Sequence, residues 1–95
     1  MLSKKFVKSR QVAKLTFEVD FAAHASQVEV VGEFNGWQPQ PLSQSKGGIY
    51  KLTLEAPTGR AYQYRYRIDG AWANEQDADG YVANPFGGYN SVVQC

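Results

Sequence analysis

Two tryptophans occupy turn segments, each directly after a run of residues with strand-like alternation. Trp37 ends the segment VEVVGEFNGW, and Trp72 lies within YRIDGAWAN. Turns normally lie at the surface, so a large flat apolar side chain there either folds back over the core or is offered to a ligand. Because Asn, Arg and Lys residues surround both tryptophans, the pattern predicts a surface patch that binds a flat, ring-shaped ligand.

Two classes of ligand have such rings. A pyranose has C–H groups on its faces, which suit an indole, and hydroxyls on its rim, which suit Arg, Lys and Asn. Trp37, Trp72, Arg65 and Asn90 supply this combination if their turns lie side by side. Single-stranded nucleic acid also stacks on aromatic rings and contacts arginine. Four acids flank Trp72 in the sequence: Asp69, Glu75, Asp77 and Asp79. Acids around the indole would repel phosphates, so the charge favours a neutral sugar.

Residues that could support catalysis or bind a metal are few. His24 is the single histidine, and no cysteine or second histidine stands near it to complete a metal or nucleophilic site. Cys95 is the single cysteine and lacks any cue for an activated thiol. The segment EQDADG spaces its oxygen ligands as a calcium loop does, but the acid required at the twelfth position falls on Phe86. We therefore expect no catalytic residue, no metal site and no cofactor.

The elements that position these residues are predicted to be strands. Four segments alternate apolar and polar residues with a period of two: QVAKLTFEVD, QVEVVGEF, GIYKLTLE and AYQYRYRID. Gly-, Pro- and Asn-rich turns separate them, and no segment has a helical period. The pattern predicts an all-β antiparallel fold of about seven short strands, and the one-sided alternation favours a sandwich over a small barrel. The inward registers are expected to hold Phe17, Tyr50, Tyr62, Tyr64 and Tyr66, with Arg65 and Arg67 on the opposite face of their strand.

Length and charge restrict the function classes further. Ninety-five residues predict a single domain, 1–95, and a net charge of +1 argues against a general polyanion binder. Positive charge is concentrated in residues 1–10, which we interpret as a solvated basic arm and a candidate edge strand. The sequence contains no membrane-length apolar run and no signal-peptide core, so we expect a cytoplasmic protein that does not bind membranes.

Three segments, VEVVGEFNGWQPQPL, GIYKLTLEAPTGRAYQYRYRIDGAW and NPFGGYNSVV, together resemble the family-48 carbohydrate-binding modules. These modules are early-set, immunoglobulin-like sandwiches found at the front of isoamylases and glycogen branching enzymes, and in the AMP-activated protein kinase beta subunit. The resemblance runs from about Val12 to Val93, and it looks closest to small stand-alone bacterial proteins. It implies an immunoglobulin-like β-sandwich that binds α-glucans and has no catalytic activity of its own.

The expected ligand is an α-1,4-linked glucan of the glycogen, starch or maltodextrin type. The resemblance implies that Trp37 and Trp72 stack on glucose rings and that Phe86 lies over another ring. Arg65 and Asn90 are expected to contact hydroxyls, with Lys51 as a further candidate. A glycogen- or starch-metabolising enzyme in trans is a candidate partner, nucleic acid is not expected, and the chain is expected to be a monomer or weak homodimer. The alternative is an early-set protein-interaction module that lacks sugar binding and docks through an edge strand or the basic arm.

Overall fold

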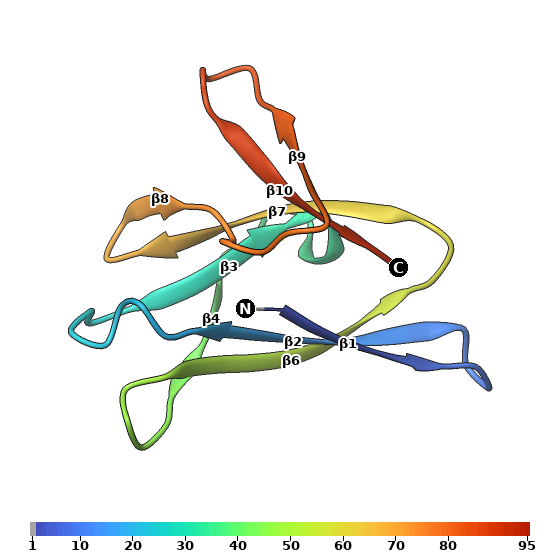
Figure 1. The fold of residues 1–95 in the computed structure, drawn as a ribbon, viewed down its shortest axis with the longest axis horizontal. Helices are drawn as coiled ribbons and strands as arrows, with labels where there is room; N and C mark the ends of the chain where they lie inside the picture. The colour runs from blue at the N-terminus through green and yellow to red at the C-terminus, as the bar shows by residue number, and fades with distance from the viewer. Residues whose placement is uncertain (1) are drawn as a thin grey trace.

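A computed structural model of the protein describes residues 2–95, which form two antiparallel β-sheets packed over a shared core (Figure 1). The first sheet has the strand order β1 (Leu2–Val7), β2 (Val12–Val19), β6 (Tyr50–Pro57), β5 (Ser43–Gln44). The second has the order β4 (Gln40–Pro41), β3 (Val28–Gly32), β7 (Ala61–Ile68), β10 (Tyr89–Gln94), β9 (Gly80–Ala83), and β8 (Ala71–Ala73) also pairs with β7. One turn of 3₁₀ helix, η1 (Glu33–Asn35), follows β3. The predicted all-β, immunoglobulin-like sandwich is confirmed.

The core consists of the inward side chains of both sheets. In β2 every second residue is fully buried: Ala13, Leu15, Phe17 and Val19. In β7 the buried residues are Tyr62, Tyr64 and Tyr66, as the alternation predicts. Phe17 contacts Tyr64 edge-on, with ring centroids 5.4 Å apart. Because burial raises the pKa of Tyr64 and Tyr66 far above the usual tyrosine range, both hydroxyls stay protonated and pack as neutral groups.

Strand β1 lies at the edge of the first sheet and pairs with β2 from Leu2↔Phe17 to Val7↔Val12. The Lys4 Nζ donates to Asp79 Oδ2 at 2.7 Å and to the Gln94 carbonyl at 3.0 Å, which joins β1 to β10 of the other sheet. The hydrogen bond from the Gln94 N–H, and then the one from Lys4, lower the pKa of Asp79 below its usual value. Residues 2–7 are therefore part of the sandwich.

Neither His24 nor Cys95 belongs to a cluster of ligating side chains. His24 is exposed between β2 and β3, and Cys95 is a half-buried thiol whose pKa burial raises. Within residues 2–95, no three His, Cys, Asp or Glu side chains gather so that they could hold a metal ion. The same residues contain no helix of the length and apolarity needed to cross a membrane.

Candidate functional site

An open hollow of about 810 Å³ lies on the outer face of the second sheet. This volume falls within the range of sites for small ligands, roughly 300–1,000 Å³. The residues that line the hollow are Val31, Trp37, Arg65, Trp72, Asn84, Pro85, Phe86, Gly87, Gly88 and Asn90. The structure thus brings together five of the residues that the sequence assigned to ligand contact: Trp37, Arg65, Trp72, Phe86 and Asn90.

The floor of the hollow follows from strand pairing around Arg65. Val31 of β3 is the register partner of Arg65 in β7, and both side chains point outward because their neighbours along each strand face the core. On its other side, β7 pairs with β10 along residues 61–64 and with β8 along residues 66–68. Arg65 therefore lies at the junction of β10 and β8, between the strand that carries Asn90 and the strand that carries Trp72.

The turn after β3 is anchored by Phe34 and Asn35. The ring of Phe34 packs against Phe17 and Tyr64, with centroid separations of 5.3 Å and 6.0 Å. The side-chain oxygen of Asn35 accepts a hydrogen bond from the Gly32 N–H at 3.0 Å. In the FNGW segment, the Phe34 side chain therefore packs against the core, and the Asn35 side chain closes the turn.

Trp37 follows this turn in an unusual backbone conformation. Its φ is 61°, in the left-handed region, and its N–H donates to the Gly32 carbonyl at 2.8 Å. That region costs a bulky residue roughly 1–2 kcal/mol. The Trp37 residue is 42% exposed, so part of its indole stays in contact with solvent. A left-handed backbone at a half-exposed indole makes Trp37 a candidate contact residue, and it is not part of the buried core.

Trp72 lies in strand β8 and not in a turn as the sequence predicted; it is 51% exposed, and two arginines lie beside its ring. It is the register partner of Arg67, and the guanidinium carbons of Arg65 and Arg67 lie 5.3 Å and 5.6 Å from its ring centroid. Both distances are within the range of cation–π attraction. The arginines thus hold the orientation of an indole that is half open to solvent.

The loop between β9 and β10 is organised by Asn84, a residue that the sequence analysis missed. Its side-chain oxygen accepts hydrogen bonds from the N–H groups of Phe86 at 2.9 Å and Gly88 at 3.1 Å, and its amide nitrogen donates to Asn90 at 3.3 Å. Phe86 is held at the tip and is 93% exposed. The Asn-Pro dipeptide at 84–85 is a turn signal that could have identified Asn84 in the sequence.

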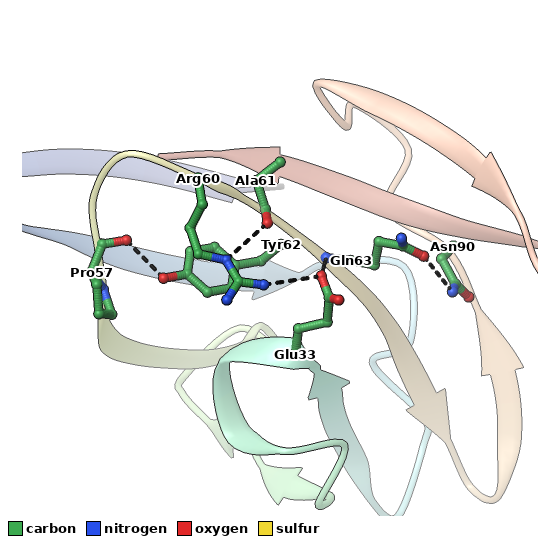
Figure 2. Close-up of polar contacts among 7 residues, drawn as sticks. All are labelled: Glu33, Pro57, Arg60, Ala61, Tyr62, Gln63 and Asn90. Atoms are coloured by element: carbon green, nitrogen blue, oxygen red, sulfur yellow. Dashed lines mark hydrogen bonds and ion pairs between the residues drawn. The ribbon is translucent and has the colours of Figure 1, made fainter.

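Hydrogen bonds connect η1, the turn that precedes Trp37, to Gln63 of β7 and onward to Asn90 of β10 (Figure 2). Glu33 accepts from the backbone N–H of Gln63 at 2.7 Å and forms an ion pair with Arg60 at 3.7 Å. The side-chain oxygen of Gln63 in turn accepts from the Asn90 amide at 3.0 Å. Asn90 is thereby fixed between Gln63 and Asn84, so its orientation is set before any ligand arrives.

The structure does not bring Lys51 to the hollow. Lys51 belongs to β6 of the other sheet, where it pairs in register with Glu18 and forms an ion pair with it at 3.5 Å. Its position in an alternating strand was read correctly, but the alternation carries no information about which sheet that strand joins.

The acids that follow or precede Trp72 in the sequence also lie elsewhere. Asp69 accepts hydrogen bonds from the N–H groups of Ser26 and Gln27, and Asp79 binds Lys4. Glu75 is only 2% exposed and accepts a hydrogen bond from the Tyr66 hydroxyl at 3.3 Å. None of the lining residues is acidic. The acids that the sequence places near Trp72 are therefore absent from the lining of the hollow.

Comparison with known proteins gives one family. Residues 6–87 match the model of carbohydrate-binding module 48, the isoamylase N-terminal domain. A 1,4-alpha-glucan branching enzyme of Xanthomonas campestris pv. campestris is 41% identical over 66 residues, which are 66% of this chain and 9% of that enzyme. A 1,4-alpha-glucan branching enzyme of Pseudoalteromonas atlantica is 34% identical over 87 residues, 86% of this chain and 12% of that enzyme. Protein FLOURY ENDOSPERM 6, chloroplastic, of Oryza sativa subsp. japonica is 36% identical over 52 residues, 54% of this chain and 10% of that protein. The chain thus spans about a tenth of the length of these relatives.

Proposed function

This chain belongs to the carbohydrate-binding module 48 family, and we propose that it binds α-1,4-linked glucan in the hollow on its second sheet. The observation that carries the proposal is the presence of two half-exposed indoles, Trp37 and Trp72, around one hollow together with the amide side chains of Asn84 and Asn90. The module itself is a binding unit and not a catalyst. Two relatives of the chain are 1,4-alpha-glucan branching enzymes, which supports a glucan of the glycogen or starch type as the ligand.

The contacts in this proposal follow the two surfaces of a glucose residue. The C–H faces of successive rings stack on Trp37 and Trp72, and the exposed ring of Phe86 covers the chain from the loop. Rim hydroxyls exchange hydrogen bonds with Asn90 and Arg65. Because the hollow is open and its aromatic side chains remain partly solvated after contact, binding buries little area. We expect dissociation constants in the micromolar to millimolar range, roughly −8 to −4 kcal/mol.

Isothermal titration with maltoheptaose, supported by native gel retardation in glycogen, tests the proposal. Trp37→Ala and Trp72→Ala are each expected to weaken binding about tenfold, and the double variant is expected to abolish it. Phe21→Ala is a matched control, because Phe21 is also 42% exposed but does not line the hollow. Lys51→Ala is a second control from the other sheet, and both controls are expected to bind as the unsubstituted protein does.

Two results would refute the proposal. Absence of glucan binding by the unsubstituted protein would exclude the function itself. Undiminished binding by the folded double tryptophan variant would exclude the hollow as its location, and a thermal melt of that variant establishes that it is folded.

A further inference from the structure

The arginines of this chain fall into two groups. Arg10 forms hydrogen bonds of 3.0 Å and 2.8 Å with both carboxylate oxygens of Glu55, and Arg60 pairs with Glu33. Arg65 and Arg67 have no ion pair and no side-chain hydrogen bond with any residue of the described chain; both instead lie against the ring of Trp72. The two guanidinium groups without an ion pair are therefore the two beside Trp72, and Arg65 also lines the hollow.

The register explains why Arg65 stays without a partner. Its neighbour across the strand pair is Val31, an apolar side chain that cannot neutralise it. The Arg65 Nε is buried and forms no hydrogen bond with the residues that the structure describes. Arg67 stands opposite Glu29 in register, yet the two side chains form no ion pair within 4 Å. A partly desolvated cation that lacks an ion pair raises the free energy of the empty site, and an anion bound beside it would lower that energy.

Among residues 2–95, no carboxylate forms an ion pair with Arg65 or Arg67. The acids near Trp72 in sequence are used elsewhere: Asp69 caps backbone N–H groups, Asp79 pairs with Lys4, and Glu75 is buried. With no acid among the lining residues, the hollow combines aromatic faces, amides and positive charge. A neutral glucan satisfies the aromatic faces and the amides but leaves both positive charges unpaired.

We infer that the hollow prefers an α-glucan that carries phosphate monoester groups, with the phosphate held by Arg65 and Arg67 next to a glucose ring on Trp72. This inference rests on the proposed function, since it names the class of glucan that the same site prefers. A phosphate monoester carries a charge of about −1.5 to −2 at pH 7. Guanidinium groups bind its oxygens through two parallel hydrogen bonds, which are stronger than those to a hydroxyl. The phosphate supplies the anion that the strand register denies to Arg65.

Single-stranded nucleic acid also combines rings with phosphates, but the chain fits it less well. Its backbone places a charge on every nucleotide and normally requires a strongly basic groove, whereas this protein has a net charge of +1. Two guanidinium groups beside paired amides match an occasional phosphate on a mostly neutral polymer.

The test uses one branched maltodextrin in two forms: phosphorylated, and the same preparation after phosphatase treatment. Titration of the full chain at low salt is expected to give about tenfold tighter binding of the phosphorylated form, equivalent to about 1.4 kcal/mol. The preference is expected to fall toward unity near 1 M NaCl, where the Debye length is about 3 Å. In the Arg65→Gln/Arg67→Gln variant the ratio of the two affinities is expected to be about one. Because the readout is a ratio, it is independent of any change in absolute affinity.

Arg10→Gln is the control, because it removes one positive charge from the turn between β1 and β2, away from the hollow; it is expected to keep the preference. Equal affinity of the unsubstituted protein for both polymers would overturn this inference and leave the proposed function intact. Binding of neither polymer would refute the proposed function itself. A preference that survives in the double arginine variant would place the phosphate elsewhere and overturn the assignment. Equally tight binding of a single-stranded oligothymidylate that competes with glucan would overturn it as well, by showing a general polyanion site.

Discussion

Gly32 is the position where a single methyl group is expected to disturb both the fold and the hollow. A Cβ at this position would lie 2.7 Å from Phe34 Cζ, 2.8 Å from Tyr64 Cβ and 2.9 Å from the Gln63 carbonyl oxygen. The carbonyl oxygen belongs to the backbone, the Tyr64 Cβ is bonded directly to the backbone of β7, and the Phe34 Cζ belongs to a ring packed against the core. None of the three can move away without shifting β7 or the turn that carries Trp37.

The magnitude of the Gly32→Ala effect is set by two opposing contributions. Loss of backbone freedom in the unfolded chain stabilises alanine by about 0.4–1 kcal/mol. Overpacking a well-filled site costs about 1–3 kcal/mol, and three contacts below 3.0 Å place this variant at the upper end. The net loss is expected to be about 1–2 kcal/mol, which lowers the melting temperature of a domain of this size by roughly 4–16 °C. Displacement of the turn is expected to weaken glucan binding as well.

Gly80→Ala is the matched control for this variant. A Cβ on Gly80 meets no atom within 4 Å, and the backbone there is not left-handed, so the same substitution is expected to be neutral or to stabilise by up to about 1 kcal/mol. Calorimetric melts and maltoheptaose titrations of both variants provide the comparison. A Gly32→Ala protein that melts within about 2 °C of the unsubstituted chain would contradict the close packing of β3 on β7.

Three further predictions concern single contacts. Asn84→Ala removes the side chain that holds the loop, so maltoheptaose titration is expected to give about fivefold weaker binding, equivalent to the roughly 1 kcal/mol of one hydrogen bond, with little change in melting temperature; unchanged affinity would remove Asn84 from the site. Tyr64→Phe deletes a buried hydroxyl that forms no hydrogen bond within the described residues, so the free energy of unfolding in urea should stay the same or rise. Tyr66→Phe deletes a hydroxyl that donates to buried Glu75 and should lower the free energy of unfolding by about 1–3 kcal/mol. Equal effects of the two substitutions would contradict the Tyr66–Glu75 hydrogen bond. Because the pKa of Asp79 is lowered in the folded state, its carboxylate stabilises the fold above the unfolded pKa of about 3.9, and that contribution is lost as pH falls through the lower folded pKa. The difference in unfolding free energy between the unsubstituted protein and Asp79→Asn should therefore be constant near pH 6 and shrink below about pH 4, and a pH-independent difference would be the contrary result.

Much of the fold could be predicted from the sequence because it depends on local alternation. In β7 the residues at even positions, Tyr62 to Tyr66, were expected to be buried and Arg65 to be exposed, and a period of two is sufficient to separate them. The family motifs brought the correct types of residue to the turns, and five of the six candidates line one hollow. Whether they contact a glucan remains the prediction that the tryptophan variants test.

Long-range contacts account for what the sequence could not predict. Lys51 alternates as outward residues do, but strand pairing assigns β6 to the sheet opposite the hollow. Asn84 appears in the sequence as an ordinary turn residue, and its role depends on Asn90 lying opposite it across the β9–β10 hairpin.

The sequence by itself determined which residues face the core, because alternation along a strand is a local property of the backbone. It also determined the chemical character of the candidate site, since its aromatic and amide residues stand in recognisable motifs. Only the tertiary structure decided the charge of the hollow. Glu75 and Asp79 are four residues apart in the chain but make different contacts: Glu75 is buried and accepts a hydrogen bond from Tyr66, and Asp79 pairs with Lys4 of the opposite sheet. Arg65 is left opposite Val31 by the strand register. The alternation of residues along a strand determines which side chains face the core, but the pairing of strands that are distant in the sequence determines which charged side chains lie near one another.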